Sequence, residues 1–134
     1  MDPIVLDRRF RVWRYGVGHS QLLLRSPADR DEPESVHVLF EGVCAVKLRT
    51  SYHPLTLQRA GGEERERILA FTEVPEKLHA RMLCWTLPNE DEGFIVCGRA
   101  TVLATSGSDI DAAWPPGARV LYRFSPGVDF PSTS

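Results

Sequence analysis

Lysine and asparagine are almost absent from this chain of 134 residues, in which Lys47, Lys77 and Asn89 are the only residues of these two types. The positive charge is therefore carried almost entirely by arginine. Arginine suits the recognition of phosphate and carboxylate groups, but a GC-rich genome produces the same composition, and we favour this second explanation. The net charge of −2 does not indicate a polyanionic partner.

Long hydrophobic runs are also missing, and a transmembrane helix would need about 18 consecutive apolar residues. Residues Met1–Arg9 place acids before the basic pair and hold too short an apolar run for a signal peptide. We therefore expect a cytoplasmic protein without membrane association. The content of 43% hydrophobic and 25% charged residues is close to globular averages. The length suits one globular domain over 1–134 with a flexible tail over 125–134.

Cysteine is scarce: Cys44, Cys84 and Cys97 form no Cys-x-x-Cys pair and are odd in number. A disulfide framework is therefore not expected. All three lie among apolar neighbours, so we expect buried thiols whose pKa is raised by burial. The four histidines are scattered singly, without metal-ligand spacing. The sequence predicts neither a metal nor another cofactor, and it assigns no catalytic residue.

Short runs of strand-forming residues alternate with turn signals along most of the chain. The expected strands are Phe10–Tyr15, His19–Arg25, Val36–Phe40, Val43–Arg49, Leu55–Leu57, Phe94–Ala104 and Arg119–Phe124. Gly98, in the middle of one strand, predicts a bulge or a close backbone approach. The acidic, proline-containing segments 26–35 and 88–93 predict exposed turns.

Residues 63–87 fit two interpretations. The charged run Glu63–Arg67 and the apolar residues after it suit either a short helix or a charged edge leading into a strand. Leu78–Leu87 has apolar residues at both helical and alternating spacing. The turn signal at Pro88 and the strand that follows favour a strand over Leu78–Leu87, and the helix stays open as the alternative.

These patterns predict a mainly β domain, or a β-dominated α+β domain. We expect about eight short, mostly antiparallel strands that form a sandwich or a partly open barrel, with at most one or two short helices. The sequence leaves open the strand order, the choice between sandwich and barrel, and the oligomeric state, a dimer included.

The opening hairpin is the segment around which we expect the fold to form. Its first strand carries apolar residues on both faces, with Phe10 and Val12 on one and Trp13 and Tyr15 on the other. The glycines of Gly16–Gly18 permit a tight turn before the chain runs back. Polar groups around an aromatic beside such a turn are typical of a binding patch. The candidate binding residues are Trp13, Arg14, Tyr15, His19, Gln21, Glu41 and Arg99.

Three functions stay open. The first is a non-enzymatic protein that recognises a protein partner through this hairpin or a sheet edge. The second is a small ligand-binding β-barrel or simple hydrolase with a pocket near Gly16–Gly18, which requires His19 and Glu41 to converge. The third is RNA binding, since Trp13 and Tyr15 interleave with arginines. The acidic remainder of the chain argues against this third function.

The segment Tyr15–Ser26 together with Val38–Val43 resembles a family of small uncharacterised bacterial domains. The shared patterns are Y-x-x-x-H-x-x-L-L-L-R-S and F-x-G-V, and they cover the N-terminal third of the chain. The resemblance implies no activity and assigns no site. By analogy with small single-domain cytosolic proteins, it implies an immunity or accessory protein that acts by binding.

Overall fold

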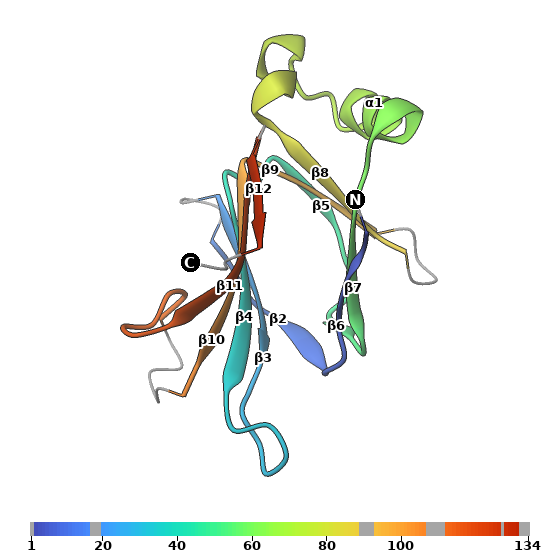
Figure 1. Cartoon of the computed structure of the whole chain (residues 1–134). Helices are drawn as coiled ribbons and strands as arrows, with labels where there is room; N and C mark the ends of the chain where they lie inside the picture. The colour runs from blue at the N-terminus through green and yellow to red at the C-terminus, as the bar shows by residue number, and fades with distance from the viewer. Residues whose placement is uncertain (1, 17–19, 89–92, 107–111, 127, 132–134) are drawn as a thin grey trace.

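A computed structural model describes residues 2–16, 20–88, 93–106, 112–126 and 128–131. The described chain is dominated by two antiparallel sheets, which confirms the predicted fold class (Figure 1). One sheet has the order β1 (Ile4–Leu6), β7 (Leu55–Arg59), β8 (Leu83–Leu87), β9 (Gly93–Cys97) and β5 (Ala45–Lys47). The other has the order β12 (Val128–Pro131), β11 (Arg119–Ser125), β10 (Arg99–Thr105), β4 (Ser35–Glu41), β3 (Gln21–Ser26), β2 (Phe10–Gly16) and β6 (Ser51–Tyr52).

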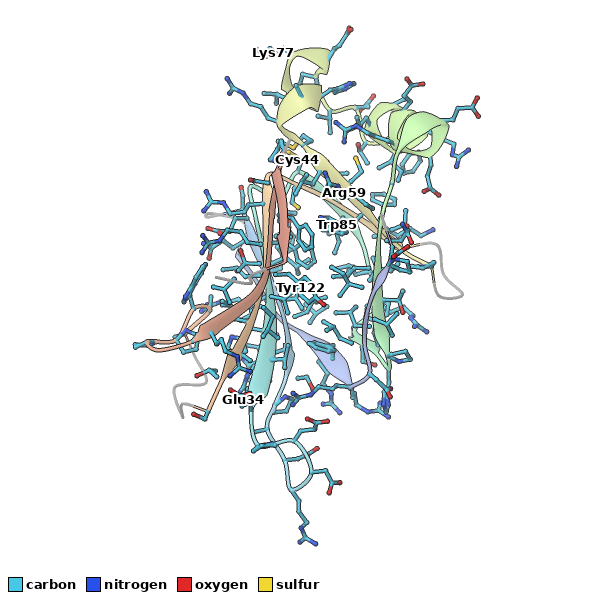
Figure 2. All side chains as sticks on the ribbon, in the orientation of Figure 1. Glu34, Cys44, Arg59, Lys77, Trp85 and Tyr122 are labelled. Atoms are coloured by element: carbon cyan, nitrogen blue, oxygen red, sulfur yellow. The ribbon has the colours of Figure 1, made fainter. Side chains whose placement is uncertain are left out.

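The main core lies between the two sheets, where alternate side chains of each sheet meet. Phe10, Leu22 and Phe40 come from the larger sheet and Trp85 and Ile95 from the smaller one, and all are 0–1% exposed. The ring of Trp85 packs edge-on against that of Phe124, with centroids 5.0 Å apart. Figure 2 shows Trp85 and Tyr122 pointing into the space between the sheets. Of the two predicted arrangements, sandwich and partly open barrel, the two facing sheets form the sandwich.

The chain passes between the sheets at a corner built from two glycines. Gly42 follows β4 with φ of +64°, a conformation that L side chains rarely adopt. A Cβ atom on Gly42 would lie 3.3 Å from the backbone nitrogen of Gly98, and that nitrogen donates to the carbonyl oxygen of Glu41 at 2.8 Å. The expected strand Phe94–Ala104 is therefore divided at Gly98 into β9 and β10, which belong to different sheets. The predicted close approach at Gly98 is confirmed.

The ambiguous region contains both kinds of structure. Gly62–Phe71 forms helix α1, which buries Ile68 and Leu69 against the outer face of the smaller sheet. The strand expected over Leu78–Leu87 is wrong for its first part, where Glu76–Arg81 forms a 3₁₀ helix, and right for the second, which is β8. Figure 1 shows both helical segments at one end of the sandwich. No helix of the described residues is long and apolar enough to cross a membrane.

Two further segments differ from expectation. The strand expected over Val43–Arg49 is limited to Ala45–Lys47, and Cys44 beside it is exposed rather than buried. The backbone of Val128–Pro131, within the segment expected to be a tail, pairs with β11 as strand β12.

Candidate binding surface on strand β2

Strand β2 is covered on its outer side over only part of its length. The two-residue strand β6 pairs with Phe10 and Arg11, and the carbonyl oxygen of Thr50 accepts a hydrogen bond from the amide of Val12 at 2.9 Å. Within the described residues, no strand pairs with the outer side of Trp13–Gly16. The last four residues of β2 therefore form an open sheet edge, which is a template for another strand.

A β-bulge in β2 changes the faces on which its aromatic residues lie. The pairing with β3 shifts between Val12 and Arg14, so Trp13 is the extra residue. The ring of Trp13 covers the guanidinium of Arg25 on the outer face, whereas Tyr15 lies opposite the core residue Leu22. The expectation that Trp13 and Tyr15 share a face is wrong, because a bulge reverses the alternation beyond it.

The aromatic side chains of the open edge are nevertheless accessible. Trp13 is 42% exposed and Tyr15 is 43% exposed, and Arg14 between them is exposed as well. One aromatic ring thus stands on each side of the edge, with a cation between them. This combination is enriched at protein interfaces, where large rigid rings supply contact area.

Three other candidate residues form a separate polar row across the outer face of the larger sheet. Glu41 on β4 lies directly between Gln21 on β3 and Arg99 on β10. Arg99 Nη1 is 4.0 Å from Glu41 Oε1. Glu41 and Arg99 thus form a partly exposed and loose ion pair. The candidate residue His19 lies outside the described residues, so its distance from Glu41 is not described.

A second row on the same face holds a buried arginine that the sequence did not single out. Arg25 on β3 lies opposite Arg11 on β2 and His37 on β4, and it is only 5% exposed. Its guanidinium carbon lies 4.7 Å from the ring centroid of Trp13, and its Nε has no hydrogen-bond partner among the described residues. The alternation Leu22, Leu23, Leu24, Arg25 was the available signal, because it places Arg25 on the same buried face as Leu23.

Beside Arg25, a cavity of about 570 Å³ opens between the start of β2, the end of β3 and the loop at 27–34. Arg9, Arg11, Trp13 and Arg25 line its sheet side, and Asp29, Asp31 and Glu32 line its loop side. The cavity lies at the start of β2 and the end of β3. The pocket expected near Gly16–Gly18 falls on a segment that lies mostly outside the described residues.

Arg8 fixes the loop that forms the far wall of this cavity. Its guanidinium donates to the carbonyl oxygens of Pro27 at 3.1 Å and Glu34 at 2.8 Å, and its Nε donates to Ser26 Oγ at 3.1 Å. Figure 2 shows Glu34 where this loop meets β4. The carboxylate of Glu34 also pairs with Arg119 at 2.9 Å. The loop wall is thus tied to Arg8, which precedes β2, to the end of β3 and to β11.

The described thiols differ in their suitability for chemistry. Burial raises the pKa of Cys97 to about 12 and raises the pKa of Cys84, so both stay protonated and hidden at neutral pH. Cys44 is exposed, with its Sγ 3.5 Å from Met82 Sδ. Among the described residues, no three metal-ligating side chains lie close enough together to hold an ion. The open edge of β2 and the arginine-lined cavity, by contrast, present groups that can bind a partner or a ligand.

No family model, curated protein or solved structure matches the chain.

Proposed function

We propose that the chain is a non-enzymatic binding domain that recognises a protein partner through the open edge of β2. In this proposal an extended segment of the partner adds a strand beside Trp13–Gly16. Strand addition of this kind takes affinity from main-chain hydrogen bonds and specificity from alternate side chains. The observation that carries the proposal is an edge with which no described strand pairs, flanked by two large rings that are each more than 40% exposed.

The bulge supports this use of the edge. Successive side chains of an added strand point to opposite faces of the sheet. Trp13 on one face and Tyr15 on the other therefore give the incoming strand an aromatic contact on each side. A strand with no such contacts would be held by its backbone alone.

Charge indicates the chemistry of the partner. Arg9, Arg11 and Arg14 are exposed along or beside β2. A segment with acidic side chains complements them, and this complementarity raises the association rate and suppresses other partners. We therefore propose an acidic, extended segment as the occupant. A role as an immunity or accessory protein, as the resemblance implies, is compatible with such binding.

We also propose that the protein acts in the cytoplasm. All three cysteines are free thiols, and one of them, Cys44, is exposed. A reducing compartment preserves an exposed thiol, whereas an oxidising one favours disulfide formation.

Site-specific photo-cross-linking tests the open edge directly. A benzophenone amino acid is placed at position 15 in one sample and at position 71 in a control, since Phe71 is 76% exposed on α1. Each protein is irradiated in a lysate of its source cells. We expect a discrete adduct from position 15 alone, and we expect Arg14→Glu to abolish it because the reversed charge repels an acidic segment.

The Arg14→Glu variant should keep its melting temperature, because Arg14 is exposed. An adduct that persists in this variant, or one that forms equally from position 71, would contradict recognition at the β2 edge.

A further inference from the structure

The charge of Arg25 is buried, and no described residue fully compensates it. Only 5% of the residue is exposed, and its Nε lacks a hydrogen-bond partner among the described residues. None of the ion pairs within the described chain involves Arg25. A buried charge without a paired acceptor is costly, and native proteins rarely retain one without a use for it.

The described neighbours of Arg25 contact it and do not neutralise its charge. The ring of Trp13 covers one face of its guanidinium at 4.7 Å from the centroid. Arg11 and His37 flank it in the same row, and its positive charge helps to lower the pKa of His37. The two arginines of the row therefore concentrate positive potential at one place on the sheet, and the planar donor fork of arginine matches an oxyanion.

This positive row borders an accessible cavity. Arg9, Arg11 and Arg25 line the cavity of about 570 Å³ together with Trp13. The arginine on the opposite wall, Arg8, is already bound to the carbonyl oxygens of Pro27 and Glu34. The donors of the sheet wall thus remain for a ligand.

The acidic residues of the cavity are partly engaged by the loop itself. Asp29 Oδ1 accepts the amides of Asp31 and Glu32 at 2.8 Å. Glu32 faces Arg8 at 3.9 Å. These carboxylates lie opposite the arginines, so the attraction for an anion is confined to the arginine side of the cavity.

We propose that this cavity binds a small molecule through a carboxylate or phosphate group held by Arg25 and Arg11. The volume lies in the range of small-molecule sites and exceeds that of a bare ion. The anion would accept hydrogen bonds from the guanidinium groups and neutralise the buried charge. This site is distinct from the open edge of β2, although Trp13 borders both and the charges of Arg9 and Arg11 lie near both.

Thermal denaturation and titration calorimetry with two probes test the site. Inorganic phosphate and sodium acetate are compared with sodium chloride at matched ionic strength, so that general screening is subtracted. Both oxyanions, or the one of the preferred class, should raise the melting temperature above the chloride value, because a ligand that binds only the folded state stabilises it. A response to phosphate alone identifies a phosphate site, and a response to acetate alone identifies a carboxylate site.

Three substitutions locate the effect. Arg25→Lys keeps the charge and loses the planar donor fork, and Arg11→Gln removes an exposed donor without touching the core. Each should weaken binding about tenfold or more, since charge-assisted bidentate pairs are the strong ones. Arg14→Gln is the matched control, because Arg14 is an exposed arginine of β2 outside the cavity lining. If Arg25→Lys does not fold, Arg11→Gln alone decides the outcome.

The proposal is overturned if neither oxyanion exceeds chloride, or if Arg11→Gln binds as tightly as the unmodified chain. The last measurement is the affinity of the protein for a fluorescent RNA oligonucleotide at several salt concentrations. Affinity that falls steeply with salt and is lost in Arg11→Gln would replace the small-molecule site with a nucleic-acid site.

Discussion

At the scale of single residues, His37 shows how a polar group on a sheet face becomes part of the structure. It is 1% exposed, and its Nδ1 lies 3.2 Å from the carbonyl oxygen of Ala113. Arg25 lies directly opposite it on the neighbouring strand β3. Burial, followed by the charge of Arg25, lowers the pKa of His37 below its usual value of 6.5, whereas the contact with Ala113 acts in the opposite direction. The neutral imidazole is therefore favoured in the folded state.

The lowered pKa of His37 makes the free energy of unfolding depend on pH. Because the pKa is lower in the folded state, the unfolded chain takes up the proton first as pH falls. The contribution of His37 is present above pH 6.5 and is lost as pH falls through the folded pKa, with a slope of at most about 1.4 kcal/mol per pH unit. Urea unfolding from pH 8 to pH 5 should show this loss, and His37→Gln should reduce it. An unchanged pH dependence in His37→Gln would show that other groups cause it.

At the scale of elements, the sequence predicted the strand bounds well where a segment fits only one periodicity. Alternation and turn residues located β2, β3, β4 and β11 to within two residues at each end. They failed in Leu78–Leu87, where Pro75 and the helix-compatible run after it form a 3₁₀ helix before β8 begins. Both periodicities fitted that segment, and the 3₁₀ helix buries none of its residues, so the apolar pattern could not separate the helix from the strand.

The candidate site was predicted in the same partial way. The sequence located the exposed Trp13, Arg14 and Tyr15, but a bulge leaves no clear signature in a single strand, so the faces were assigned wrongly. Arg25 was missed because its importance depends on the absence of a partner in space. Cys44 was misjudged because it lies beside β5, an edge strand whose own residues are half-buried or exposed.

The corner that joins β4 to β5 and β9 to β10 has a sharp requirement for glycine. Gly42→Ala should destabilise the fold by about 1–2 kcal/mol, because an L residue is strained at positive φ. The close approach of its Cβ to the Gly98 nitrogen, at 3.3 Å, adds to this cost. Gly16→Ala is the control, since no atom lies within 4 Å of the added Cβ there. Equal urea midpoints for the two variants would refute the corner argument.

At the scale of the whole molecule, stability comes from the layer of side chains between the two sheets. Trp85 is 0% exposed and joins the smaller sheet to Phe124 of the larger one. Trp85→Ala should cost about 3–5 kcal/mol, since it removes a large buried ring and leaves a cavity. Phe71→Ala, at a residue 76% exposed, should cost roughly 1 kcal/mol or less. Comparable losses in chemical denaturation would mean that α1 contributes as much as the core.

The whole fold also explains how β2 comes to have an open edge. The chain leaves β6 after two residues and crosses to β7 in the smaller sheet, so nothing in the described chain covers the second half of β2. Most natural sheets protect such an edge. Here the exposed arginines beside the edge discourage pairing between copies, which is why we propose an acidic partner and not self-association.

Hydrogen exchange of the protein with its cross-linked partner measures the central claim most directly. If the partner adds a strand to β2, the backbone amides of Trp13–Gly16 should exchange more slowly in the complex, while those of α1 should not change. Unchanged exchange at Trp13–Gly16, with slower exchange confined to another surface, would contradict recognition through the β2 edge.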